Sequence, residues 1–99
     1  MKNIIRQLDK AFDNKIRLGV MSILAVNDRV PFNDLKSTLE LTDGNLASHL
    51  KLLESMDYVR VHKSFSGRKP VTTYEITSLG REAFLTHLKK VHALARERR

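Results

Sequence analysis

The segment from Leu41 to Pro70 changes its hydrophobic period partway along, and this change restricts the possible folds more than any other feature. Up to about Met56, leucines recur every three to four residues, which predicts an amphipathic helix with Thr42 as its N-cap. After Asp57 the period becomes two, as in β-strands, and a second strand follows a polar turn. The segment therefore predicts a helix that leads directly into a two-stranded hairpin, with strands at residues 58–63 and 71–76.

The remainder of the chain is expected to be helical, because apolar residues recur there at helical spacing. An amphipathic arm covers residues 2–12, and Asp13 is the expected cap of a second helix that ends near residues 27–28. Pro31 breaks this helix, and a short third helix covers residues 32–39. With a final helix from Ser78, the predicted fold class is α+β and mostly α.

The composition favours a single basic domain over residues 1–99, without repeats or linkers. The 18 Lys and Arg residues exceed the 11 Asp and Glu residues, so the net charge of +7 attracts nucleic acid or an anionic membrane. The chain has no Cys, which excludes a disulfide framework and a thiol nucleophile and fits a reducing cytoplasm. No apolar run approaches about 20 residues and charge interrupts the N-terminus early, so we expect a soluble, cytoplasmic protein.

Burying Leu46, Leu50 and Leu53 turns the opposite, polar face of their helix outward. Small side chains on that face would let the helix approach base edges in the DNA major groove, where polar side chains could form hydrogen bonds. The candidate contact residues are Asp43, Gly44, Asn45, Ala47, Ser48 and, for a phosphate, Lys51. For this helix taken alone, an ordinary amphipathic helix with a solvated outer face is an equal alternative.

The hairpin tip, residues 66–70, is basic, because Lys63, Arg68 and Lys69 lie around the turn glycine Gly67. Such a finger can follow the phosphate backbone or enter the minor groove, and Ser66 completes the candidate residues there. The alternative is a solvated tip whose charges only limit edge-to-edge pairing of strands. Together, the helix and the hairpin favour a domain that binds double-stranded DNA.

Four segments together resemble small MarR-like and ArsR-like transcriptional regulators of the winged helix-turn-helix fold. These segments are Asp13–Leu18, Leu41–Glu54, Ser66–Pro70 and Tyr74–Thr77. The resemblance spans nearly the whole chain, and the combination is more specific than any single segment. It implies a two-stranded β wing and terminal helices that form a dimer.

The same resemblance implies roles for particular residues. Thr42 and the residues from Asp43 to His49 fall where those families contact bases and phosphates, and Arg68 falls at the wing tip. The resemblance thus implies a dimeric regulator on a pseudo-palindromic operator. Without a Cys pair the chain offers no ArsR-type metal site, it is shorter than a typical MarR protein, and an effector ligand is left open.

Apolar stripes on the two terminal segments exceed what a small monomer readily covers, and exposed patches of this kind usually mark an interface. The candidate interface residues are Ile4, Ile5, Leu8, Phe12, Leu88, Val91 and Ala95. A symmetric dimer would place two recognition helices about 34 Å apart, one turn of DNA. The alternative is that both terminal helices pack over the core of one chain.

No residue pattern indicates catalysis, a cofactor or a metal. His49, His62, His87 and His92 lack the spacing of metal ligands, although His87 and His92 could join a site between subunits. Ser48 and His49 are neighbours in a helix and point about 100° apart, so they are not a nucleophile pair.

Three functions are compatible with these features. The first is a homodimeric winged-helix regulator, most simply a repressor that blocks polymerase. The second is a protein-interaction module whose basic face docks an acidic protein. The third, and weakest, is peripheral binding to anionic membrane through the basic amphipathic ends.

Overall fold

The fold is described from a computed structural model for residues 8–97. The elements in chain order are the 3-10 helix η2 (Lys10–Phe12), α1 (Lys15–Ala25), β1 (Val30–Pro31), α2 (Phe32–Leu39), α3 (Asp43–Ser55), β2 (Val59–Ser66), β3 (Lys69–Ile76) and α4 (Ser78–Ala95). The mostly helical α+β class is therefore confirmed. Helix α2 has the predicted bounds, and α3 and α4 begin after the predicted caps, Thr42 and Thr77.

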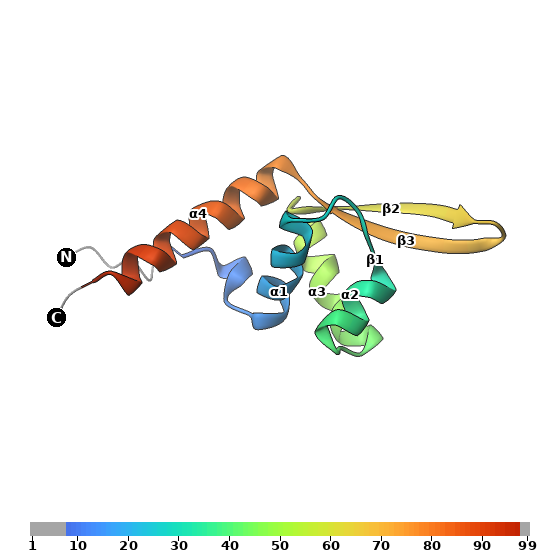
Figure 1. Ribbon diagram of the computed structural model, residues 1–99, viewed down its shortest axis with the longest axis horizontal. Coiled ribbons are helices and arrows are strands. Elements are labelled where there is room, and N and C mark those ends of the chain that lie inside the picture. The colour runs from blue at the N-terminus through green and yellow to red at the C-terminus, as the bar shows by residue number, and fades with distance from the viewer. Residues whose placement is uncertain (1–7, 98–99) are drawn as a thin grey trace.

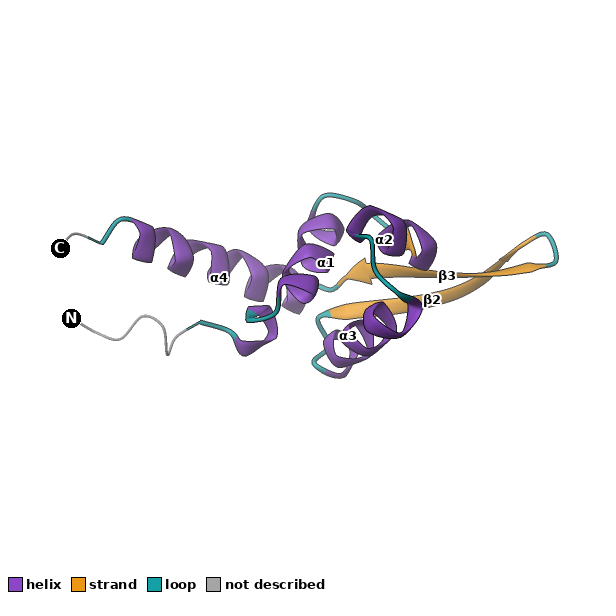
Figure 2. Cartoon of the chain, turned by 90° about the horizontal axis from the view of Figure 1, so that it is seen from below, coloured by secondary structure: helices purple, strands orange, loops and turns teal. Residues whose placement is uncertain are grey.

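The molecule is elongated, with extents of 58 × 25 × 21 Å. Helices α1, α2 and α3 form a central body, from which the β2–β3 hairpin extends to one side and α4 to the other (Figure 1). Seen from below, α2 and α3 lie in front of the strands, and α4 again leads away from the hairpin (Figure 2). The hairpin tip and the far end of α4 are thus separated by the whole length of the molecule.

The sheet has three antiparallel strands in the order β1-β3-β2. The hairpin turn has only two residues, since Ser66 pairs with Lys69 and Gly67 adopts φ +65°, a conformation that favours glycine. The strands therefore reach closer to the tip than the five-residue turn of the prediction allowed. The third strand, β1, was not predicted, because two residues are too few to show a period, and Pro31 suits an edge strand.

The core is formed by one face of each helix together with the base of the hairpin. Phe12, predicted as an interface residue, lies inside this core with only 4% of its surface exposed. Its ring stacks on Tyr58 at 5.8 Å between centroids and meets the edge of Phe84 at 5.7 Å. The assignment of Phe12 to an exposed dimer stripe was wrong, because the chain folds η2 back against its own α4.

The start of the chain also differs from the predicted arm and cap. Only residues 10–12 of the predicted arm are helical among those described, as a 3-10 turn capped by Asp9, and residues 2–7 lie outside the described part. The N-cap of α1 is Asn14, whose side chain accepts hydrogen bonds from the Ile16 and Arg17 amides. Asp13 instead ends the 3-10 turn, so the prediction chose the wrong one of two adjacent capping residues.

Gly80 fixes the distance between α4 and the base of the hairpin. A Cβ atom at this position would lie 2.1 Å from the backbone oxygen of Tyr58, so no larger residue fits without moving the backbone. By contrast, nothing lies within 4 Å of a Cβ atom built on Gly44 at the start of α3. The two glycines of these helices therefore have opposite packing environments.

We expect Gly80→Ala to lower the free energy of unfolding by about 3 kcal/mol, because the methyl group forces α4 away from the Tyr58 backbone. Gly44→Ala is the matched control and should raise it by about 0.5–1 kcal/mol through helix propensity. Urea unfolding followed by circular dichroism measures both values. Equal stability of the Gly80 variant and the parent would contradict this packing.

Candidate nucleic-acid interface

The outer face of α3 is open to solvent along its length. Leu46, Leu50 and Leu53 are at most 1% exposed and hold the helix against the core. The predicted contact residues other than His49, which is half-buried, are all exposed: Thr42, Asp43, Gly44, Asn45, Ala47, Ser48 and Lys51. The structure therefore brings small and polar side chains together on one accessible helix face, as the interpretation requires.

The first turn of α3 combines a cap with an ion pair. The Thr42 hydroxyl accepts a hydrogen bond from the Asn45 amide at 3.2 Å. Asp43, which would repel a phosphate, forms an ion pair with Lys36 of α2 at 2.7 Å. Because Lys36 offsets the Asp43 charge, the positive end of the helix dipole is kept as a suitable place for an anion.

His49 is held by Arg17, a residue of α1 that the sequence analysis did not single out. The Arg17 Nη1 lies 3.0 Å from His49 Nδ1, and its Nε donates to the Ala11 carbonyl at 2.6 Å. Since a guanidinium can only donate, Nδ1 accepts and the proton of neutral His49 is on Nε2. Burial, and next the Arg17 charge, lower the pKa of His49 below its usual value. Arg17 therefore keeps His49 a neutral N–H donor.

The predicted wing residues all lie exposed at the end of the hairpin. They are Lys63, Ser66, Gly67, Arg68 and Lys69, and no acidic residue occurs between positions 63 and 71. Acidic charge is confined to the base of the hairpin, where Glu75 contacts His62 at 2.8 Å and Arg60 at 3.8 Å. The hydrogen bond from His62 is the main cause that lowers the pKa of Glu75. The tip is thus purely cationic.

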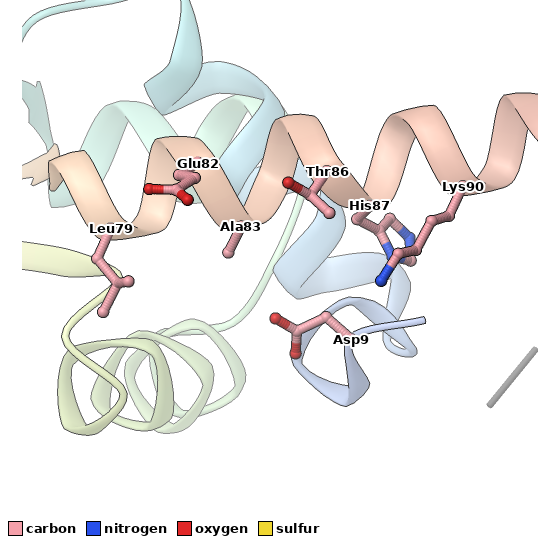
Figure 3. A pocket seen from close by; sticks show the side chains of 7 residues that line it. All are labelled: Asp9, Leu79, Glu82, Ala83, Thr86, His87 and Lys90. Carbon is pink, nitrogen blue, oxygen red and sulfur yellow. The ribbon is translucent and has the colours of Figure 1, made fainter. Parts of the chain in front are cut away.

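A shallow pocket, which the sequence analysis did not predict, lies between η2 and α4 (Figure 3). It has a volume of about 330 Å³ and is lined by Asp9, Leu79, Glu82, Ala83, Thr86, His87 and Lys90. His87 is buried, and its Nδ1 has no hydrogen-bond partner among the residues described. Within residues 8–97, no three His, Cys, Asp or Glu side chains are grouped as metal ligands.

The remaining candidate residues lie on the terminal segments. Leu88 and Val91 are each 42% exposed on α4, and Ala95 is exposed near its end. Leu8 is half-buried, whereas Ile4 and Ile5 lie outside the described residues. No helix in the described part of the chain is long and apolar enough to cross a membrane.

Comparisons with known proteins agree with this geometry. An uncharacterized protein of Methanocaldococcus jannaschii is 36% identical over 87 residues, which cover 88% of this chain and 95% of that protein. The structure of a transcriptional regulator homologue from Pyrococcus horikoshii OT3 has 33% identity and a TM-score of 0.86, and the match covers 93% of each chain. The S. aureus MepR–DNA complex shares the fold at 13% identity, with a TM-score of 0.76 over 93% of this chain and 75% of that one.

The family assignment follows from a match that covers most of the chain. The family model described as the winged helix DNA-binding domain matches residues 16–95, from α1 to the end of α4. The fold is also that of a solved MarR-family regulator from Silicibacter pomeroyi, with a TM-score of 0.67 at 17% identity over 91% of this chain and 60% of that one. The chain therefore belongs to the winged helix DNA-binding domain family.

Proposed function

We propose that the protein is a homodimeric transcriptional repressor that binds double-stranded DNA, with α3 in the major groove and the wing on the neighbouring backbone or minor groove. The observation that carries this proposal is the open, polar face of α3 beside a hairpin tip without acidic residues. The small side chains of Gly44 and Ala47 permit close approach to base edges. Asn45 and Ser48 read bases, and Lys51 pairs with a phosphate.

Two further residues support phosphate binding at α3. Lys36 lies beside the first turn through its contact with Asp43, where it offsets the negative charge that would otherwise repel a phosphate from the helix N-terminus. His49 carries its proton on Nε2, because Arg17 occupies Nδ1, and an N–H group at this position can donate to a phosphate oxygen. Both contacts are independent of base sequence and fix the position of α3 on the duplex.

The dimer is supported by an apolar row along α4. Leu85, Leu88 and Val91 are spaced three residues apart and are 48%, 42% and 42% exposed. Because α4 extends away from the body, a second copy can cover this row without obstructing α3 or the wing (Figure 1). Two-fold symmetry then presents two recognition helices to the two halves of an operator. A bound dimer represses by occupying the site that polymerase needs.

Arg68→Ala should weaken binding to duplexes of many sequences and reduce the slope of log Kd against log salt by about 1, because one phosphate contact is lost. Fluorescence anisotropy at several salt concentrations measures the slope. Lys89→Ala removes the same charge from α4, far from the wing, and should bind as the parent does.

Asn45→Ala should instead change the preferred sequence, at a cost of about 1–3 kcal/mol at its base.

An unchanged salt slope in the Arg68 variant would reject the role of the wing. Failure of the parent protein to bind any duplex, together with stable capture of an acidic protein, would reject the DNA-binding proposal itself. Selection of bound sequences from a random duplex pool then identifies the operator. A two-fold symmetric sequence is the expected result.

Leu88→Asp should convert the dimer to a monomer, raising the dissociation constant of the dimer by at least about 100-fold, because the interface would bury an unpaired charge. Leu52→Asp is the matched control, since Leu52 on α3 has the same exposed fraction of 42%. Sedimentation velocity measures the oligomeric state of both variants. A Leu88 variant that is still dimeric would place the interface elsewhere.

The titration of His49 tests its protonation state. We expect an NMR titration midpoint below the usual value of about 6.5, which moves upward in Arg17→Met because one of the two causes of the lowered pKa is removed. The folded state then binds fewer protons than the unfolded chain. The contribution of His49 to stability is therefore present above about pH 6.5 and is lost as the pH falls through the folded pKa.

Lys15→Met is the control for this titration, since it removes a cation from the exposed first turn of α1 and should leave the His49 midpoint unchanged. A midpoint at or above about 6.5 in the parent would contradict the neutral donor.

A further inference from the structure

The wing carries an aromatic side chain that the fold does not use. Phe65 on β2 is 73% exposed, although it is among the largest apolar residues of the chain. It pairs in register with Pro70 on β3, so the two side chains are cross-strand neighbours on one face of the hairpin. We call this pair the wing spot. Only the Ser66–Lys69 pair separates it from the two-residue turn formed by Gly67 and Arg68.

The surroundings of the wing spot specify the chemistry of its partner. Lys63 lies on the same face of β2, two residues before Phe65, while Arg68 is in the turn and Lys69 begins β3 next to Pro70. No acidic residue occurs from position 63 to position 71. The complementary surface is therefore apolar at its centre and carries negative charge around it. The minor groove of duplex DNA has this pattern, because its walls are deoxyribose sugars placed between phosphates.

The position of the wing spot argues against its being covered by a second copy of the chain. The exposed apolar row on α4 lies at the opposite end of the molecule from the hairpin tip (Figure 1). A dimer formed through that row would leave both wings outermost. Neither Phe65 nor Pro70 belongs to the core of the chain or packs against it.

We propose that Phe65 and Pro70 pack against the sugars and base edges of the minor groove, while Lys63, Arg68 and Lys69 hold the adjacent phosphates. This inference rests on the proposed function and adds a contact that is apolar and therefore independent of salt. Apolar side chains are known to occupy minor grooves in this way, whereas phosphate contacts made by cations weaken as the salt concentration rises. The wing thus binds by two physically separable contributions.

A single tryptophan at the wing spot reports the contact directly. The chain contains no Trp, so Phe65→Trp introduces a single indole. Its emission should be quenched or shifted to shorter wavelength when duplex DNA is added. Val26→Trp is the control, because Val26 is 81% exposed at the end of α1, and its emission should not respond.

Affinity measurements separate the apolar contribution from the charged one. Phe65→Ala should raise Kd about 10-fold at every salt concentration and leave the salt slope unchanged. Arg68→Ala changes the slope instead, and Phe65→Leu should recover part of the affinity because it restores an apolar side chain. Since Phe65 is exposed, the circular dichroism of each variant should match that of the parent.

The outcomes distinguish this inference from the proposed function. If the parent binds duplex DNA but Phe65→Ala binds equally well and the emission of the Phe65→Trp variant does not change, the inference is wrong and the proposed function stands. If the parent does not bind duplex DNA, both fail. If the indole of the Phe65→Trp variant responds to phosphatidylserine vesicles and not to duplex, the wing spot is a membrane contact and the inference is overturned.

Discussion

The burial of three leucines on α3 is the constraint on which the rest of the structure depends. Leu46, Leu50 and Leu53 share one helix face, and each fully buried leucine contributes about 1.5–3 kcal/mol. Only one orientation of α3 about its own axis buries all three leucines in the core. The same orientation turns Gly44 and Ser48 toward solvent, so the stability of the core and the accessibility of the candidate interface have a single cause.

Tyr58 connects that helix to the terminal segments. Its backbone oxygen accepts a hydrogen bond from the Thr77 amide at 3.1 Å and lies against Gly80 of α4. Its hydroxyl donates to Asp9 at 2.5 Å, and burial, followed by this hydrogen bond and the Asp9 charge, raises the pKa of Tyr58 to about 12. The start of the hairpin, η2 and α4 therefore meet at one residue, which fixes how the dimerisation segment proposed here is oriented relative to α3.

The sequence predicted those features whose signals are local. Periodicity gave α2, α3, the hairpin and α4, and the caps at Thr42 and Thr77 gave two helix starts. Contacts between distant residues have no such signal: Arg17 and His49 are 32 positions apart, and β1 forms only because Val30 reaches Tyr74. The fold and the exposure of the candidate site residues were thus predictable, whereas the contacts between distant residues around the candidate site were not.

The placement of charge and apolar surface explains how one small domain could perform two kinds of association. Exposed apolar residues on α4 would associate through burial, which moderate salt does not weaken. The cations of the wing would act through phosphate contacts, which salt weakens steeply. These surfaces lie at opposite ends of the molecule, so each can associate without the other. Because salt weakens only the phosphate contacts steeply, the proposed dimer would persist at salt concentrations that release the DNA. Phe65 is the exception, since it places an apolar side chain among the cations of the wing.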